Sequence, residues 1–145
     1  MMLLLLAHAG ATLMMTGLIW FVQIVHYPLF ERVPALGWVE YERHHVRRTT
    51  VVVMPLMLAE AVTAIWLLVR QPAGVGPALP VVGVTLLLII WASTATLQVP
   101  CHRRLQSGME LGVVRNLVRT NWLRTAAWTA RGALALALIT MGGQA

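Results

Sequence analysis

Residues 1–30 read MMLLLLAHAGATLMMTGLIWFVQIVHYPLF, and this stretch decides the class of fold. It begins with an apolar run that reaches Val25 and has no basic segment before it. A secretory signal peptide has a basic start and an apolar core of about 7–15 residues, whereas a helix that crosses a bilayer needs about 20 apolar residues. We therefore predict an uncleaved transmembrane helix over about residues 3–25. We expect Pro28 to stop this helix with His26 at its end.

Three more apolar segments of similar length follow, at about residues 50–69, 79–99 and 121–141. We expect the polar stretch LGWVEYERHHVRRTT (36–50) to be helical and to run straight into the first of these segments. In the whole chain of 145 residues, 59% are hydrophobic and 11% are charged, and the mean hydropathy is +0.75. A soluble domain carries about 25% charged residues. The expected fold is therefore all-α: an integral membrane four-helix bundle that forms a single domain over residues 1–145.

The arginines set the expected orientation. All eleven basic residues are Arg, and eight of them lie in the two long connections, residues 26–49 and 100–120, while the short connection on the other side contains only Arg70. Because basic residues favour the cytoplasmic side, we expect both termini on the extracytoplasmic side, in a multi-pass protein of the bacterial inner membrane. The formal charge of +6 comes without aromatic residues interleaved in a basic patch, so nucleic-acid binding is not expected.

The ends of the expected helices resemble one another in pairs. The first helix ends QIVHYP and the third ends QVPCH, while the second begins HVRRTT and the fourth begins VRTNWLRT. This similarity favours two helical hairpins related by a parallel repeat, an arrangement that some membrane folds show.

Four of the five histidines fall at the expected cytoplasmic ends of the helices. His26 ends the first helix, His44 and His45 precede the second, and His102 follows the third. Imidazole is the commonest protein ligand for metals, and facing helices of a bundle often form metal sites. We therefore predict an iron, copper or haem site formed by His26, His45, His102 and His44, with Glu40 in support and Glu42 as the other nearby carboxylate. Such rings are also normal at the headgroup level without any ligand, and that interpretation stays open.

Polar side chains form one stripe along each expected helix. At 100° per residue, His45 lies within about 60° of Glu60, whereas His44 points about 160° away, so His45 is the better candidate for the interior. Glu60 and Arg131 lie at equal depth near the middle of the bilayer, which predicts an ion pair because an isolated charge there is costly. The expected supporting or cavity residues are Gln23, Glu40, Glu60, Gln98, Asn121, Arg124, Trp128 and Arg131. Such an interior suits a lipid-soluble molecule such as a quinone.

Four pieces of sequence carry a resemblance to known proteins: WFVQIVHYPLF (20–30), YERHHVRRTTVVVMPLMLAE (41–60), LQVPCHRRL (97–105) and NWLRTAAWTARG (121–132). They resemble a group of small four-helix bacterial membrane proteins without an assigned activity. A weaker likeness is to the anthrone-oxygenase-like membrane proteins, which also have four helices, a proline near the ends of helices one and three, and a Trp…Arg start to helix four. That likeness implies an oxygenase or an aromatic substrate, and it transfers no catalytic residue.

The function expected from these features is that of a membrane-embedded metal- or haem-binding redox protein, acting as an oxidoreductase or an oxygenase. Two alternatives stay open. One is a non-catalytic integral subunit of a larger membrane complex or of a homo-oligomer. The other is a small proton-linked transporter that uses Glu60 and Arg131, which the lack of a broken helix in mid-membrane disfavours.

Overall fold

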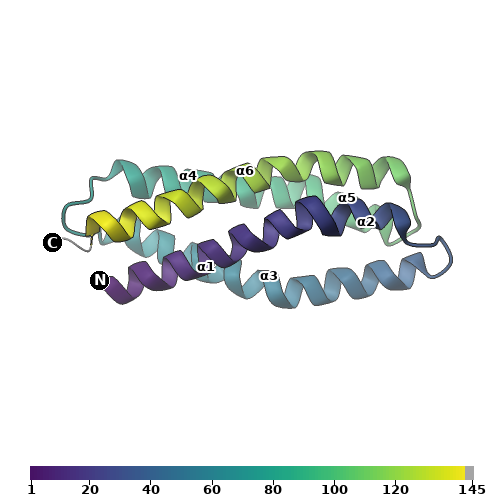
Figure 1. Cartoon of the computed structure of the whole chain (residues 1–145), viewed down its shortest axis with the longest axis horizontal. Coiled ribbons are helices and arrows are strands. Elements are labelled where there is room, and N and C mark those ends of the chain that lie inside the picture. Colours follow the sequence, from purple (N-terminus) through teal and green to yellow (C-terminus); the bar gives the residue numbers. More distant parts are fainter. Residues whose placement is uncertain (143–145) are drawn as a thin grey trace.

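The structure, a computed structural model, describes residues 1–142 (Figure 1). Within this range the regular structure is entirely helical and forms four long helical columns. The first column consists of α1 (Met2–Phe21), a π-helical turn (Val22–His26), α2 (Tyr27–Leu29) and a 3₁₀ turn (Phe30–Arg32).

The second column is the single helix α3 (Trp38–Val69). The third column consists of α4 (Ala78–Ser93), a second π-helical turn (Thr94–Gln98) and α5 (Val99–Leu105), and the fourth is α6 (Leu111–Gly142). The columns run antiparallel in sequence order, so residue 1 and the end of α6 lie at one end of the bundle (Figure 1). We call the opposite end, which holds residues 33–37 and 106–110, the loop end.

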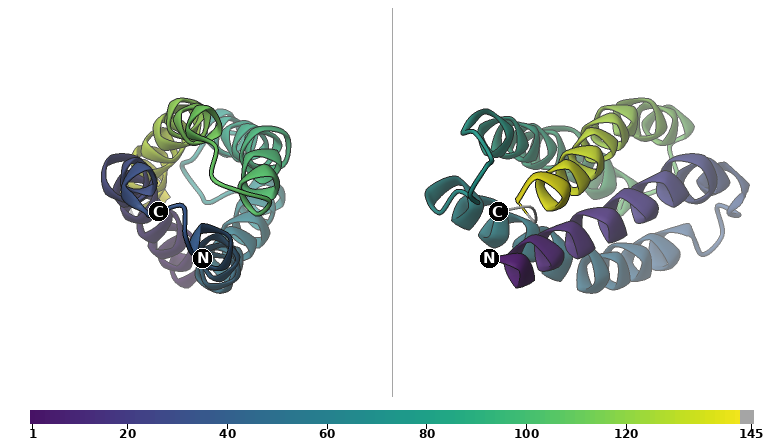
Figure 2. Two further views of the ribbon diagram at one scale, coloured as in Figure 1. Left: turned by 90° about the vertical axis from the view of Figure 1, so that its right-hand side faces the viewer. Right: turned by 60° about the vertical axis from the view of Figure 1, so that its left-hand side comes forward.

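The columns form a ring in which α1 packs against α3 and α6, and α4 packs against the same two helices (Figure 2). The helices α3 and α6 therefore face each other across the ring, and side chains that meet between them lie in the centre of the bundle. This geometry explains how polar residues far apart in sequence reach a common interior.

Three of the four columns are long enough and apolar enough to cross a membrane: Met2–Arg32, Trp38–Val69 and Ala78–Leu105. The fourth column, α6, has 32 residues, but it contains Arg124 and Arg131 in its middle part, and these charges lower its mean hydropathy. Both arginines are buried, so the outer surface of α6 is more apolar than its composition indicates.

Two helices begin well before the apolar segments from which they were predicted. The helix α3 starts at Trp38 and α6 starts at Leu111, whereas the apolar runs start near residues 50 and 121. The polar residues between these positions continue the same helices, as we expected for the section before residue 50. An apolar run marks the part of a helix that suits hydrocarbon, and it does not mark the end of the hydrogen-bonded backbone.

The two halves of the bundle have the same order of elements. In each half a long helix leads into a π-helical turn, a short helix with proline as its second residue (Pro28 or Pro100), a connection and a helix of 32 residues. The expected stop at Pro28 is wrong, because helical structure continues to Arg32. A π turn holds one extra residue and alters the hydrogen-bond ladder, so the chain accommodates the missing N–H of proline without ending the helix.

The loop end is closed by a buried aromatic contact. Trp38, the first residue of α3, is fully buried against Phe30, and its indole Nε1 donates a hydrogen bond to the carbonyl oxygen of Leu105, at 2.8 Å. These contacts hold the start of α3 against α5. They thereby fix the two elements that carry the polar cluster described next.

Candidate metal centre and cavity

Three metal-ligating side chains converge at the loop end of the bundle. Glu42 and His45, one turn apart on α3, and His102 on α5 place one ligand-type atom each within 4.8 Å of one another. The ring N–H at Nδ1 of His102 donates a hydrogen bond of 2.6 Å to Oε1 of Glu42. We call Glu42, His45 and His102 the loop-end cluster.

Neighbouring side chains orient the two imidazoles of this cluster. Nε2 of His26 lies 2.9 Å from Nδ1 of His45, and Oγ1 of Thr49 lies 3.2 Å from the same nitrogen. The Tyr27 hydroxyl lies 3.1 Å from Nε2 of His102 and donates to it when Nδ1 carries the proton. Hydrogen bonds to the second nitrogen of an imidazole are what hold metal-ligating histidines in position.

Glu42 is the most unusual member of the cluster. Its side chain is completely buried, and its second carboxylate oxygen, Oε2, has no hydrogen-bond partner among the described residues. A buried carboxylate is costly unless its oxygens are paired or coordinate a metal. Glu42 therefore offers an unused acceptor beside two imidazoles.

The remaining predicted ligands lie on a different side of α3. His44 and Glu40 have side chains that are 57% and 82% exposed, and they face each other at 3.8 Å. The structure thus brings together His26, His45 and His102 and leaves His44 and Glu40 outside. Of the two carboxylates near the histidines, the sequence analysis favoured Glu40, whereas the structure places Glu42 in the cluster, on the same helix face as His45.

A cavity of about 350 Å³ adjoins the loop-end cluster. His45, His102 and Tyr27 form part of its wall, and Gln98 and Arg124 form further polar parts. Its other walls are mostly apolar, and the apolar side chains come chiefly from the first and second columns: Met15, Leu18, Ile19, Val22, Val53 and Met57. The cavity is therefore a largely apolar space with a few polar groups, which is typical of small-molecule sites.

The cavity opens sideways out of the bundle. Four of its lining residues are exposed: Thr50 and Met54 on α3, and Val99 and Arg103 on α5. The mouth therefore lies between the second and third columns, and these are two of the columns that are apolar enough to cross a membrane.

Arg124 of α6 lies at the inner wall of this cavity and is 7% exposed. Its Nε has no hydrogen-bond partner among residues 1–142, and its guanidinium carbon lies 5.2 Å from the ring centroid of Trp128. The Tyr27 hydroxyl is a side-chain hydrogen-bond neighbour of the guanidinium, and a cation above an aromatic face is stabilised modestly. The Nε donor of Arg124 still has no acceptor among the described residues.

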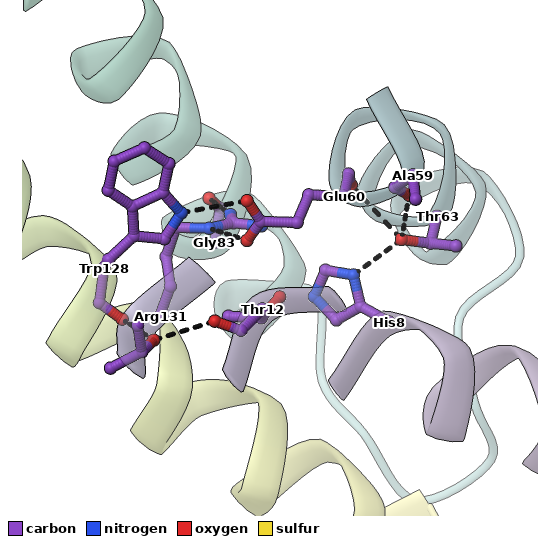
Figure 3. Close-up of polar contacts among 9 residues, drawn as sticks. His8, Thr12, Ala59, Glu60, Thr63, Gly83, Trp128 and Arg131 are labelled. Carbon is purple, nitrogen blue, oxygen red and sulfur yellow. Dashed lines mark hydrogen bonds and ion pairs between the residues drawn. The ribbon is translucent and has the colours of Figure 1, made fainter. Parts of the chain in front are cut away.

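A second polar centre lies in the middle of the bundle (Figure 3). Oε1 of Glu60 on α3 lies 3.2 Å from Nη2 and 3.3 Å from Nε of Arg131 on α6, which confirms the predicted ion pair. The indole Nε1 of Trp128 donates to Oε2 of Glu60 at 2.9 Å, and Nη1 of Arg131 donates to the carbonyl oxygen of Gly83. Both carboxylate oxygens of Glu60 and all three guanidinium nitrogens of Arg131 have a partner, which is the pattern of a structural lock between helices.

Two buried amides attach the π turns to α6. Gln23 donates from Nε2 to the carbonyl oxygen of Val118 at 3.1 Å and accepts a bond of 2.9 Å from Nδ2 of Asn121. Gln98 accepts from the hydroxyl of Ser93 at 3.0 Å and donates to Oγ1 of Thr120 at 3.3 Å. Gln98 also lines the cavity, whereas Gln23 and Asn121 are part of the packing between α1 and α6.

No protein-family model, curated protein or solved structure matches the chain significantly. The fold and the site together define a helical bundle of the membrane type that carries a partly buried Glu/His cluster beside a largely apolar cavity.

Proposed function

We propose that the chain is an integral membrane metalloprotein whose loop-end cluster holds one non-haem transition-metal ion, and that it acts as an oxidoreductase or oxygenase on a lipid-soluble molecule. The observation that carries this proposal is the buried carboxylate of Glu42, with an unpartnered Oε2, next to His45 and His102. An ion bound to these three groups would satisfy that oxygen and would lie at the wall of the cavity.

The donor set favours a non-haem metal. Two imidazoles and one carboxylate with further positions open are typical of non-haem Fe(II) oxygenases, and zinc accepts the same donors. The rings of His45 and His102 lie 5.3 Å apart, and those of His26 and His45 lie 4.7 Å apart. This close packing of rings supports a compact ion more than a macrocycle inserted between them.

We further propose that all four columns cross the inner membrane, with the loop end in the cytoplasm and both termini on the other side. The outer surface of α6 supports the fourth crossing, because its exposed side chains include Trp122, Leu123, Leu136 and Met141. Arginines at the loop end, among them Arg43, Arg47, Arg103 and Arg119, support the orientation through the positive-inside rule.

Matched pairs of variants test the metal site. We expect the protein purified in mild detergent and loaded with Fe(II) or Zn(II) to retain about one equivalent of metal by elemental analysis. Removal of a residue that only supports a metal ligand weakens metal binding about ten- to hundredfold. Glu42→Gln and His45→Gln remove proposed ligands, so they should weaken metal retention at least as much. Their controls are Glu40→Gln and His44→Gln, which alter the exposed neighbours of the same types and should retain the wild-type metal content.

Two results would overturn the proposal. One is substoichiometric metal in correctly folded wild-type protein after loading with either ion. The other is an equal loss of metal in the control variants, which would mean that exposed side chains bind the ion non-specifically. A Soret absorption band in protein expressed with haem available would mean that the bound group is haem and not a non-haem ion.

A further inference from the structure

Arg124 differs from the other buried arginine of α6. Arg131 is paired with Glu60 and is bonded to the Gly83 carbonyl oxygen. No ion pair among residues 1–142 includes Arg124, and its Nε is buried without a partner. The Tyr27 hydroxyl is a side-chain hydrogen-bond neighbour of the guanidinium, but it is a single uncharged acceptor and Nε stays without one. Because a buried charge without a counter-ion is costly, Arg124 can bind a further acceptor that the described part of the chain does not supply.

The surroundings of Arg124 limit what could supply those acceptors. Most of the cavity wall is aliphatic, and the Thr94 hydroxyl is already used within its own helix, where it donates to the carbonyl oxygen of Ile90 at 2.8 Å. The site therefore combines one fixed cation with a long apolar surface. Such a combination recognises a molecule with an acceptor group at one end and an apolar body.

The position of the mouth limits how the molecule arrives. Met54 and Val99 at the rim are exposed and belong to columns that are apolar enough to cross a membrane. In a bilayer this side opening faces lipid, and a molecule dissolved in the lipid reaches Arg124 without crossing water. Arg103, on the loop-end part of the rim, can reach the headgroups with its long side chain.

From these observations we infer that the cavity binds a lipid-soluble molecule whose head carries acceptor oxygens, a carboxylate or a quinone carbonyl, with Arg124 as its hydrogen-bond donor. The molecule enters between α3 and the third column. This inference names the ligand class of the site proposed above, but binding depends on Arg124 and the cavity and does not require a bound metal ion.

Equilibrium binding to protein in nanodiscs tests the inference with three probes of similar apolar length. The probes are dodecanoate, a decyl-substituted benzoquinone and the headless alkane dodecane, each titrated by calorimetry. We expect at least one of the two acceptor-headed probes to bind with one-to-one stoichiometry and dodecane to bind at least tenfold more weakly. Saturation by dodecanoate alone identifies a carboxylate ligand, and saturation by the quinone alone identifies a carbonyl ligand.

Variants separate the role of Arg124 from that of general folding. Arg124→Met should weaken binding at least tenfold, whereas Arg119→Met, which removes an exposed arginine of the same helix, should not change it. Val53→Trp fills the cavity without altering Arg124 and should abolish binding in a protein that keeps its wild-type elution volume and helix content. Arg124→Lys keeps the charge and should retain part of the affinity, which guards against a loss caused by misfolding.

The inference is overturned if neither acceptor-headed probe binds, or if Arg124→Met and Val53→Trp bind like wild type. The metal proposal and the ligand inference can fail independently of each other. Probe binding does not require metal, so chelator-treated protein and the Glu42→Gln variant should still bind the probe. A protein that binds metal and no probe contradicts only the inference, and one that binds the probe and no metal contradicts only the metal proposal.

Discussion

Trp128 is the residue that joins the two polar centres of the bundle. The indole N–H donates to Glu60, and its ring face lies beside the guanidinium of Arg124. Arg124, Trp128 and Arg131 follow one another at helical spacing, so one face of α6 supplies both buried cations and the aromatic ring between them. The polar interior is therefore continuous from the cavity to the middle of the bundle.

The Glu60–Arg131 pair should matter for stability chiefly when one partner is removed. We expect Arg131→Leu and Glu60→Leu each to lower the free energy of unfolding by about 3–5 kcal/mol, because each leaves a buried charge unpaired. The double variant should recover much of this loss, since two apolar side chains leave no charge behind. Unfolding in mixed SDS and mild detergent measures the cycle.

The exposed pair between Arg115 and Glu31, 3.2 Å apart, provides a control for this cycle. Removing either of its partners should change the free energy of unfolding by no more than about 1 kcal/mol. A double variant of Glu60 and Arg131 that is as unstable as the sum of the two single variants would show that the pair is not coupled.

For single residues, the sequence predicts a side-chain contact well when membrane depth and helix face are enough to determine it. Depth alone predicts the contact between Glu60 and Arg131. The choice between carboxylates near His45 needs the helix angle: Glu42 lies about 60° from His45 and Glu40 about 140°. The same angles place Glu40 about 40° from His44, and the structure pairs these two residues on the outside.

The π turns are the elements that the sequence does not reveal. The turn Val22–His26 holds one residue more than an α-helical turn needs, between α1 and α2. Apolar periodicity cannot show a single extra residue in a short span, and proline at position 28 indicates a stop equally well. The apolar run alone does not mark the start of α3 at Trp38, since residues 38–49 are too polar to continue it; the expected helical section over residues 36–50 does.

Deletion variants test whether the turn accommodates an extra residue. Removing Ile24, an exposed residue inside the π turn, should allow an α-helical turn to form while Tyr27 keeps its face toward the interior. Removing Met14, an exposed residue inside the regular part of α1, should turn all later residues of that helix by about 100°. We expect the Ile24 deletion to remain monodisperse in size-exclusion chromatography and the Met14 deletion to aggregate.

An α-helical turn in place of the π turn removes the altered hydrogen-bond pattern that accommodates Pro28. Thermal unfolding of the Ile24 deletion should therefore occur at a lower temperature than in wild type. Equal aggregation of both deletion variants would mean that the π turn is an essential part of the fold and not a local insertion.

On the scale of the whole molecule, the antiparallel order of the columns puts both connections of the loop end on one side. Cysteine labelling tests that side directly, because the chain has one cysteine, Cys101, which is buried. In a Cys101→Ser background, we expect Ala73→Cys to react with a membrane-impermeant maleimide in intact cells. Ser107→Cys should react only after the membrane is permeabilised. The reverse labelling pattern would invert the proposed orientation.

The four-helix architecture follows from composition and segment length, whereas the depth of the site follows only from the length of α3. The 32 residues of α3 span about 48 Å at 1.5 Å per residue, while the hydrocarbon of a bilayer is about 30 Å thick. If the end of α3 at Val69 lies at the far boundary, its first residues, including Glu42 and His45, stand beyond the hydrocarbon. The loop-end cluster would then lie where two phases meet: under the proposed function, a hydrated ion would reach it from the aqueous side and an oil-soluble reactant from the lipid side. Two substances that hardly share a solvent would thus meet at one protein wall.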